Sequence, residues 1–360
     1  MTRITVQGIG VVGAFGAGIG ALRQALELGS SPRTPLSVPT GAGPVELSVF
    51  QADTSPLKEL LSSKVLRRMD HFTKLGLLAS RLALADAGLA DTGHEGLGVI
   101  IASGYGATAT TYALLDSIIA DGDACSSPTH FAGSLHNACP ANIAIVLGAT
   151  GPSLTVSQFD LSVPSALLTA RQWLLDGRVE RVLFGAVDEL SDLIGYHWLR
   201  TRGLPRPEPM TPLCTKTESA VPGEGAAFLV LSRVAEARPG YCTLESVLTG
   251  RGQPCLPSAA TLLMLNADGR QELGSRYAAA GSRIACSTPL YGSMPASPAF
   301  DLAVAALLLK EGRVVASPGA SVCDGQGQVA TVGPLGADRI ACLTLAEEDG
   351  YGLVELGRLL

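Results

Sequence analysis

Charged residues are scarce in this sequence. Lysine, arginine, aspartate and glutamate make up 16% of its 360 residues, and hydrophobic residues make up 47%. Soluble domains contain about 25% charged residues on average. A chain with so little charge must bury much of its surface, so we expect a large core and an obligate subunit interface. The net charge is −6 and the lysines and arginines form no cluster, which argues against nucleic acid or an anionic membrane as a partner.

Closely spaced cysteine pairs are absent as well. The eight cysteines are scattered along the chain, with no CxxC pair among them. Zinc sites use such pairs, and small secreted domains use dense cysteine frameworks. A lone glycine cluster such as GIGVVGAFG is only a weak sign of a dinucleotide site, and we interpret it as a tight turn. The sequence therefore predicts reduced thiols, no metal site and no cofactor.

Long apolar runs are also missing. The longest, LAVAALLL at 302–309, is far shorter than the ~18 residues that a membrane-spanning helix needs. The N-terminal MTRITVQGIGVVGAFGAG contains Thr5 and Gln7 and has little positive charge ahead of it, so it reads as a strand and turn rather than a signal peptide. We expect a cytoplasmic protein without a membrane partner.

What the sequence does contain is an alternation of strand and helix patterns. An amphipathic helix is predicted at 71–88, and the uncharged run GLGVIIASG after it is typical of a strand that is covered on both faces. Residues 30–56 are rich in Pro, Ser, Thr and Gly and are expected to be loop with one short strand near VELSVF. Further strands are predicted at 3–13, 153–157, 181–186 and 226–234, and further helices at 19–28, 108–120, 137–148 and 163–176.

The linker-like ARPG at 237–240 divides the chain into two expected halves, 1–236 and 237–360. The second half repeats the ingredients of the first on a smaller scale. Its strand patterns include CTLESVLTG and LLMLNA, and its clearest helix pattern is PAFDLAVAALLLKEG. Alternating strands and helices predict a mostly parallel α/β sheet in each half, and two such halves suggest an internal duplication.

Several stretches now carry a family resemblance. The segments ITVQGIGVVGAFG, RRMDHFTKLGLLASRLALADAGL, SPTHFAGSLHNACPANIAIVLGATGPSLTVS and VPGEGAAFLVL resemble the N-terminal half of a β-ketoacyl synthase. LNADG and YGSMPASPAFDLAVAALLLKEGRV continue the resemblance more weakly. It implies a thiolase-like fold of five layers, αβαβα, built from two related α/β halves. It also implies a dimer whose sheets join across the subunit interface.

The resemblance places Asp160 where active synthases carry their nucleophilic cysteine. The register is set by GPS at 151–153 and by Ser157. A thiolate is a strong nucleophile and a good thioester partner, whereas a carboxylate is weak and would form an anhydride that hydrolyses readily. We therefore expect Asp160 to cap or polarise the first turn of the following helix instead of carrying an acyl group.

Three partner positions depart from the family as well. Asp268 in LNADGRQE stands at the position of the first catalytic histidine. In TPLYGSMP, Ser293 stands at the second histidine and Thr288 at the lysine. The histidines polarise the thioester carbonyl and assist decarboxylation, tasks that require N–H donors of suitable pKa. The resemblance therefore implies no catalytic residue at these four positions and no condensation by this chain alone.

A chain that keeps the synthase fold but lacks the nucleophile resembles the chain-length factor, or β subunit, of type II polyketide systems, and this chain fits that description. Such a subunit forms a heterodimer with an active ketosynthase, meets the acyl carrier protein through that complex, and lines the tunnel for the growing polyketide or fatty acyl chain. Unlike the usual chain-length factor, this chain has no glutamine at the cysteine position, since Gln158 lies two residues earlier.

Two stretches are expected to carry that role, although ordinary core packing would explain either. The helix at 107–116 places four residues at i, i+3, i+4 and i+7, where they could form one tunnel-lining face: Thr108, Thr111, Tyr112 and Leu115. The resemblance places LHNACPAN at 135–142 at the subunit contact, which gives four interface residues: His136, Asn137, Ala138 and Cys139.

Two other functions stay open at this point. One is a repurposed thiolase-fold enzyme that uses Asp160, Asp268 and Ser293 as a new polar constellation. The other is a stand-alone scaffold that binds acyl groups or acyl carrier protein, although the net charge of −6 argues mildly against an acidic carrier.

Overall fold

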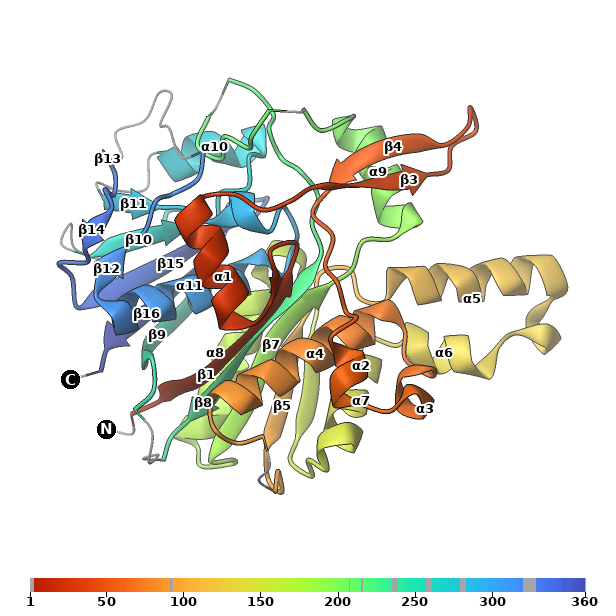
Figure 1. Cartoon of the computed structure of the whole chain (residues 1–360), viewed down its shortest axis with the longest axis horizontal. Coiled ribbons are helices and arrows are strands. Elements are labelled where there is room, and N and C mark those ends of the chain that lie inside the picture. Colours follow the sequence, from red (N-terminus) through yellow and green to blue (C-terminus); the bar gives the residue numbers. More distant parts are fainter. Residues whose placement is uncertain are drawn as a thin grey trace.

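The computed structural model describes residues 3–90, 93–206, 208–214, 216–234, 239–256, 261–278, 283–319 and 328–359. Its main sheet has 12 strands and contains two groups of five with the same topology (Figure 1). The first group runs in the spatial order β6 (Ser153–Val156), β5 (Gly98–Ala102), β7 (Arg181–Asp188), β8 (Gly225–Ser232) and β1 (Thr5–Gly13).

The second group repeats this order. It runs β11 (Arg283–Ala285), β10 (Leu262–Leu265), β15 (Arg339–Leu345), β16 (Gly350–Arg358) and β9 (Cys242–Arg251). In both groups the first two neighbouring pairs are parallel and the last two are antiparallel. The expectation of two related α/β halves is therefore confirmed at the level of topology. The groups join where β1 pairs with β9 at Thr5 and Val6. The expected boundary at 236/237 lies outside the described residues.

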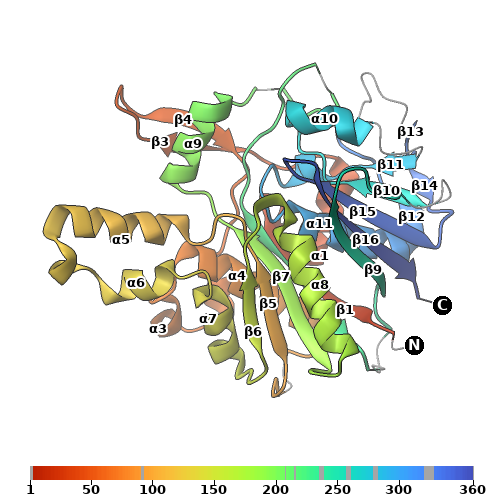
Figure 2. The ribbon, with the colours of Figure 1, turned by 180° about the vertical axis from the view of Figure 1, so that it is seen from behind.

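Two helices fill the space between the strand groups. α8 (Ser162–Leu175) contacts β7 and β5 on one side and β9 on the other, and α11 (Ser297–Glu311) lies between β8 and β15. Every residue of 297–309 is buried. α4 (His71–Asp86) and α7 (Ala138–Leu147) cover the outer face of the first group, and α10 (Gln271–Ala278) covers the second (Figure 2). These are the five expected layers.

Close packing of α4 on β1 explains two of the N-terminal glycines. A Cβ placed on Gly10 would lie 2.0 Å from the carbonyl oxygen of Ala79, and one on Gly8 would lie 2.4 Å from that of Ala83. No side chain fits at either position, so the backbone of the strand lies directly against the helix. The glycines of GIGVVG therefore serve helix–strand packing.

The segment 30–56 differs from the expectation of one short strand. It holds a hairpin of β3 (Thr34–Val38) and β4 (Val45–Val49), which forms a separate small core with α9 (Asp192–Arg202) around Trp198. Proline and serine in TPLSV hide the strand pattern, and contacts with α9 stabilise it. The short helices α2 (Leu57–Leu60), α3 (Ser63–Leu66) and α6 (Pro128–Ser134) were not predicted either, whereas α1 (Gly18–Leu28) was.

The remaining elements are short. β2 (Gly16–Ala17) pairs with β1, β13 (Gln328–Val329) with β11, and β12 (Arg313–Val314) with β14 (Gly333–Pro334). Single 3₁₀ turns occur at η1 (Asp123–Cys125), η2 (Phe159–Leu161) and η3 (Thr288–Leu290). Within the described ranges, no helix is long and apolar enough to cross a membrane.

Residues 108–134 form an arm that projects from the body. It consists of α5 (Thr108–Asp121), η1 and α6, and its two helices lie side by side (Figures 1 and 2). Leu114 is the buried residue of α5. Three consecutive residues fix the root of the arm: Thr108 Oγ1 lies 2.8 Å from Ser191 Oγ, the Ala109 N–H donates to Glu189 at 2.8 Å, and the Thr110 hydroxyl donates to Asp70 at 3.3 Å.

Three carboxyl groups, those of Asp188, Glu189 and Asp301, are buried in the protein. Burial raises the pKa of Asp188 to about 6, although the Ser103 hydroxyl and the Gly104 and Tyr105 N–H groups donate to it. Burial likewise raises the pKa of Glu189 to about 7 and that of Asp301 to about 7. The folded protein therefore retains protons that the unfolded chain has already released.

We predict that the protein becomes less stable between pH 5 and pH 8. The three pKa values are raised in the folded state, so the associated stability is complete below the unfolded pKa values near 4 and is lost as pH rises through about 6 to 7. Urea unfolding at several pH values measures this slope. Asp301→Asn should flatten it, whereas the exposed Glu46→Gln should leave it unchanged. Stability that rises from pH 5 to pH 8 would contradict the prediction.

Candidate functional site

Three of the four positions that depart from the synthase pattern meet at one place. Asp160 lies in η2, directly before α8, and Asp268 follows β10. Ser293 lies between η3 and α11. The shared partner is Arg270, two residues after Asp268. All of these residues follow the carboxyl ends of parallel strands, which is where binding sites of α/β sheets usually form.

The Arg270 guanidinium holds both carboxylates. Its Nη2 donates to Asp160 Oδ1 at 2.9 Å and its Nη1 to Asp160 Oδ2 at 3.2 Å, which makes a bidentate pair. Its Nε lies 2.8 Å from Asp268 Oδ2. The Ser293 hydroxyl donates to that same Asp268 oxygen. We call these four residues the arginine clamp.

Little of the arginine clamp is exposed. The side chains of Arg270, Asp160 and Asp268 are 12%, 16% and 4% exposed. Burial alone would lower the pKa of Arg270, but Asp268 and Asp160 outweigh it and hold that pKa well above its usual range. With two carboxylates and one guanidinium the arginine clamp is a closed, ion-paired unit in which the Nε, Nη1 and Nη2 atoms all have partners.

The expected capping role of Asp160 is wrong. No side chain caps the N-terminus of α8, and the Asp160 carboxylate binds Arg270 instead. Ser162 stabilises this turn. Its hydroxyl oxygen accepts from the Gln158 N–H at 2.7 Å, and its O–H donates to the Phe159 carbonyl at 2.7 Å. The bidentate fork of an arginine outcompetes a backbone N–H for a carboxylate because two charge-assisted bonds form at once.

Thr288, at the lysine position of the family, is separate from the arginine clamp. It is fully buried in η3, and its hydroxyl lies 3.5 Å from Cys286 Sγ. Burial raises the pKa of the Cys286 thiol to about 12, so this thiol is not a nucleophile near neutral pH. Thr288 therefore packs beneath the site and does not face it.

A cavity of about 840 Å³ opens beside the arginine clamp. Arg270, Asp160 and Ser293 lie in its wall together with apolar groups such as Trp198, Leu161 and Met294. Two further arginines of the wall are also ion-paired, Arg202 with Glu218 and Glu272 and Arg251 with Glu348. Its volume falls within the usual range for small-molecule sites, which is about 300–1,000 Å³.

Sequence reasoning missed several polar residues of this cavity, including Arg202, Arg251 and Arg270. Arg270 stands two positions after Asp268 in LNADGRQE, where a search for a cation that compensates the new acids would have found it. His197 of α9 also lies in the cavity wall. Nothing in the sequence indicated that His197 belongs to this site, because α9 lies in no motif of the resemblance. Only the fold brings α9 next to the cavity.

The expected tunnel residues lie elsewhere. Tyr112 and Leu115 are exposed on α5, and Thr108 and Thr111 are half-buried near its root. The Thr111 hydroxyl donates to the Ala107 carbonyl at 2.9 Å. None of the four tunnel residues lies in the wall of the cavity beside Asp160. Their place in a tunnel therefore depends on a second subunit and stays a prediction.

The expected interface residues divide into two groups. His136 and Asn137 are exposed and Ala138 is half-buried, as an interface requires. Cys139 is different, because it is fully buried in its own subunit. Its sulfur packs so closely on α4 that a Cβ on Gly76 would lie 2.6 Å from it. The interface expectation for Cys139 is therefore wrong: the residue faces inward on α7.

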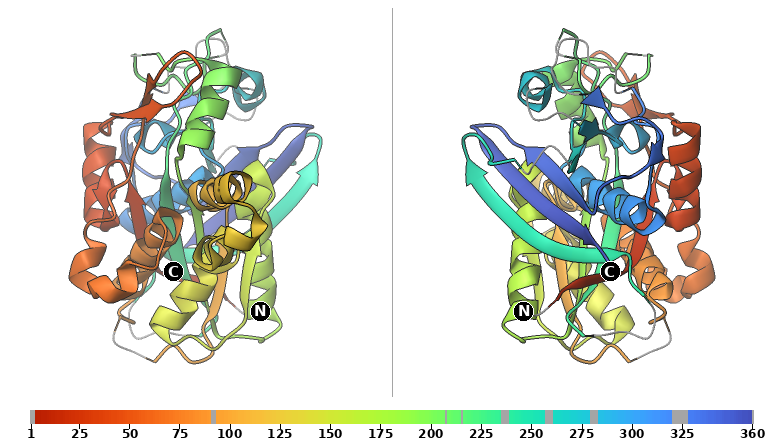
Figure 3. Two further views of the ribbon diagram at one scale, coloured as in Figure 1. Left: turned by 90° about the vertical axis from the view of Figure 1, so that its right-hand side faces the viewer. Right: turned by 90° about the vertical axis from the view of Figure 1, so that its left-hand side faces the viewer.

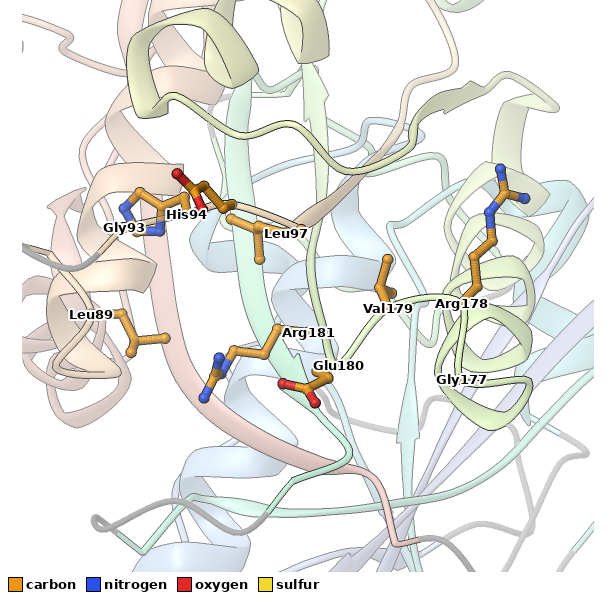
Figure 4. Close-up of a pocket in the computed structure, with 11 residues that line it drawn as sticks. Leu89, Gly93, His94, Leu97, Gly177, Arg178, Val179, Glu180 and Arg181 are labelled. Carbon is orange, nitrogen blue, oxygen red and sulfur yellow. The ribbon is translucent and has the colours of Figure 1, made fainter.

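A second, smaller cavity of about 280 Å³ lies at the opposite ends of the strands (Figure 4). Its walls come from the turns before β5 and β7 and include His94 and Arg178. Figure 4 shows Arg178 pointing away from Leu97, and its guanidinium lies 4.9 Å from the ring centre of Trp173. These polar groups do not converge. The described part of the chain also contains no cluster of His, Cys, Asp and Glu that could hold a metal.

We predict that Arg270→Gln destabilises the protein by about 3 kcal/mol or more, because it removes the cation that pairs with two buried carboxylates. Urea unfolding measures the loss. Adding Asp160→Asn and Asp268→Asn to Arg270→Gln should recover most of it. The control is Arg251→Gln, whose pair with Glu348 is 78% and 82% exposed and should contribute less than about 1 kcal/mol. Equal losses in both single variants would contradict the prediction.

Comparison with known proteins gives the site its context. A model of the β-ketoacyl synthase N-terminal domain matches residues 4–237. A 3-oxoacyl-(acyl-carrier-protein) synthase 2 of Coxiella burnetii is 23% identical over 69% of this chain and 62% of its own length. An oxytetracycline polyketide putative β-ketoacyl synthase 1 of Streptomyces rimosus is 28% identical over 75% of this chain and 66% of its own length. The chain thus spans less than two thirds of these relatives.

Solved structures share the fold over the whole chain. The ishigamide ketosynthase/chain length factor superposes with a TM-score of 0.81 and 18% identity, covering 100% of both chains. A ketosynthase in complex with its chain length factor from Xenorhabdus doucetiae has a TM-score of 0.78 and 17% identity, covering 99% of this chain and 98% of that one. Since the family model matches well over half of the sequence and the fold agrees throughout, this chain belongs to the β-ketoacyl synthase family.

Proposed function

We propose that this chain is a non-catalytic subunit that pairs with an active ketosynthase in the cytoplasm and helps to form the tunnel for a growing polyketide or fatty acyl chain. One observation carries the proposal. The positions where active synthases have their cysteine and first histidine hold Asp160 and Asp268, and both side chains are bound to Arg270.

The bonding within the arginine clamp supports a subunit that does not catalyse condensation. Acyl transfer from a thioester needs a nucleophile that can leave again, and the Asp160 carboxylate is already held by two charge-assisted bonds. Arg270 cannot accept a proton, and its high pKa keeps it charged. Ser293 has committed its own proton to Asp268. No group of the arginine clamp is free to attack a carbonyl or to move a proton.

The exposed apolar side chains of the arm support a partner subunit. Tyr112, Leu115 and Ile119 follow one another at helical spacing on α5, and Ile119 is 84% exposed. Phe131 of α6 is 58% exposed. Exposing this many apolar side chains to water is unfavourable in free energy, so we expect a second protein surface to bury them.

The sheet edge supports the same proposal. β6 is the outermost strand of the first group, and its Leu154 is 36% exposed. An open edge with an exposed apolar side chain is a template for pairing with another strand. The ishigamide protein and the Xenorhabdus complex, which share this fold, are described as ketosynthases with chain length factors, and we carry that pairing over as part of the proposal. The acyl carrier protein would meet the assembled pair.

A repurposed enzyme is the second candidate, because one observation favours it. Asp160 and Ser293 lie in the wall of a cavity large enough for a small substrate, and the Ser293 hydroxyl donates to Asp268. The closed bonding of the arginine clamp weighs against it, since a carboxylate held by a guanidinium is a poor base. The two candidates differ in which variants abolish turnover.

Co-expression with the ketosynthase encoded nearest to it in the same genome tests the first candidate. We predict a one-to-one heterodimer by native mass spectrometry. Condensation by the complex should need the partner's cysteine and should change by less than about threefold in Asp160→Asn. A soluble homodimer whose turnover Asp160→Asn abolishes would favour the enzyme instead.

The tunnel residues allow a separate prediction. Where Thr111 and Leu115 line the tunnel, extra volume at either position blocks the last two-carbon extensions by steric overlap. Thr111→Leu and Leu115→Trp should therefore shift the products of the complex toward shorter chains, as read by mass spectrometry. The matched control is Leu28→Trp on α1, a position that is 69% exposed and lies outside the arm, α7, β6 and α8. Unchanged product lengths in a fully assembled complex would remove these residues from the tunnel.

A further inference from the structure

Basic residues are missing from a long part of the sequence. The chain has 26 lysines and arginines, yet none lies between Arg81 and Arg171. This stretch contains the arm, α7, β6 and the first part of α8. It is the stretch that carries the exposed apolar side chains Ile119, Phe131 and Ile145. The surface proposed above as an interface therefore has no lysine or arginine of its own.

Acidic residues remain on that surface. Asp116, Asp121 and Asp123 are exposed on the outer part of the arm. Three aspartates with no lysine or arginine give residues 108–134 a formal charge of −3, half of the −6 of the whole chain. Among the residues that the structure describes, none forms an ion pair with these aspartates, while ion pairs are frequent around the cavity. Figure 3 (left) views the arm end on.

A symmetric pair of two copies would meet through the same surface on both sides. Such a contact brings two arms with identical negative charge into one interface, where repulsion grows as water is excluded. Arg68 is the cation beside the cleft at the root of α6, and it belongs to the body of the molecule, not to the arm. The apolar side chains favour association in general, and the aspartates determine which partner is accepted.

We infer that the arm selects a different chain over a second copy of itself, and that the partner presents lysines or arginines opposite Asp116, Asp121 and Asp123. This inference rests on the proposed pairing with a ketosynthase and names the chemistry of the partner's surface. Apolar side chains supply the buried area, and charge complementarity supplies specificity and speeds the encounter.

The test compares two sets of charge changes that are equal in number. The arm variant carries Asp116→Asn, Asp121→Asn and Asp123→Asn. The control variant carries Glu27→Gln, Glu46→Gln and Glu59→Gln, which are exposed acids on α1, β4 and α2. Both variants have the same net charge, so a general effect of charge affects them equally. Each is mixed with the purified ketosynthase at 50 mM and 500 mM NaCl.

We expect the arm variant to bind the ketosynthase at least tenfold more weakly than wild type at 50 mM NaCl, with most of the difference lost at 500 mM because salt screens the charges. Alone, it should self-associate more than wild type in analytical ultracentrifugation. The control variant should match wild type in both measurements. Circular dichroism checks that all three proteins are folded.

Two results would overturn the inference while leaving the proposed function intact. One is an arm variant that binds the ketosynthase like wild type at both salt concentrations. The other is a wild-type chain that forms a homodimer as tightly as it binds the ketosynthase. Failure of the wild-type chain to bind the ketosynthase at any salt concentration would instead overturn the proposed function itself.

Discussion

The burial of α8 and α11 between the two strand groups is the constraint on which the rest of the structure depends. Each helix must be largely apolar on the faces that pack against the strands, and in α11 the whole run from Ser297 to Leu309 is buried. The two helices also begin at the same cavity, since Asp160 precedes one and Ser293 precedes the other. The partial positive charge of helix N-termini suits a site with more carboxylates than cations. Core packing thus determines where polar side chains gather.

The arginine clamp is a charged cluster in which each charged group has a partner of opposite sign. Placing two acids at buried positions would be costly if each were unpaired. Arg270 offsets that cost by binding both, and Ser293 satisfies a remaining lone pair. The arginine clamp also links the two halves of the fold, because Asp160 belongs to the first half and Arg270 to the second.

The sequence predicted most of the fold and only part of the site. Strands and helices with long apolar patterns were placed within a few residues. The resemblance also predicted correctly that Asp160, Asp268 and Ser293 lie in one site. Arg270 was missed because it lies in a loop, two residues after Asp268, where no periodic pattern marks a site residue. Only the structure shows that its side chain extends to Asp160. Cys139 was misplaced because sequence alone does not show which side of α7 faces α4.

The hairpin of β3 and β4 shows the same limit from another direction. The residues of β3 show little strand pattern, and the contacts that stabilise the hairpin come from α9, which is more than 140 residues away in the sequence. Local patterns carry no information about such a partner. The same limit applies to the arm. Its helix α5 was predicted well, but its projection from the body depends on the contacts at its root, which the sequence does not show.

The three bonds at that root have a kinetic consequence. Thr108, Ala109 and Thr110 fix the first turn of α5 to three separate points of the body, so the direction of the arm is set when the chain folds. A partner of the kind proposed above would then meet a preformed surface, and docking would cost little conformational entropy. Association of this kind proceeds as a rigid-body encounter, without a slow ordering step after contact.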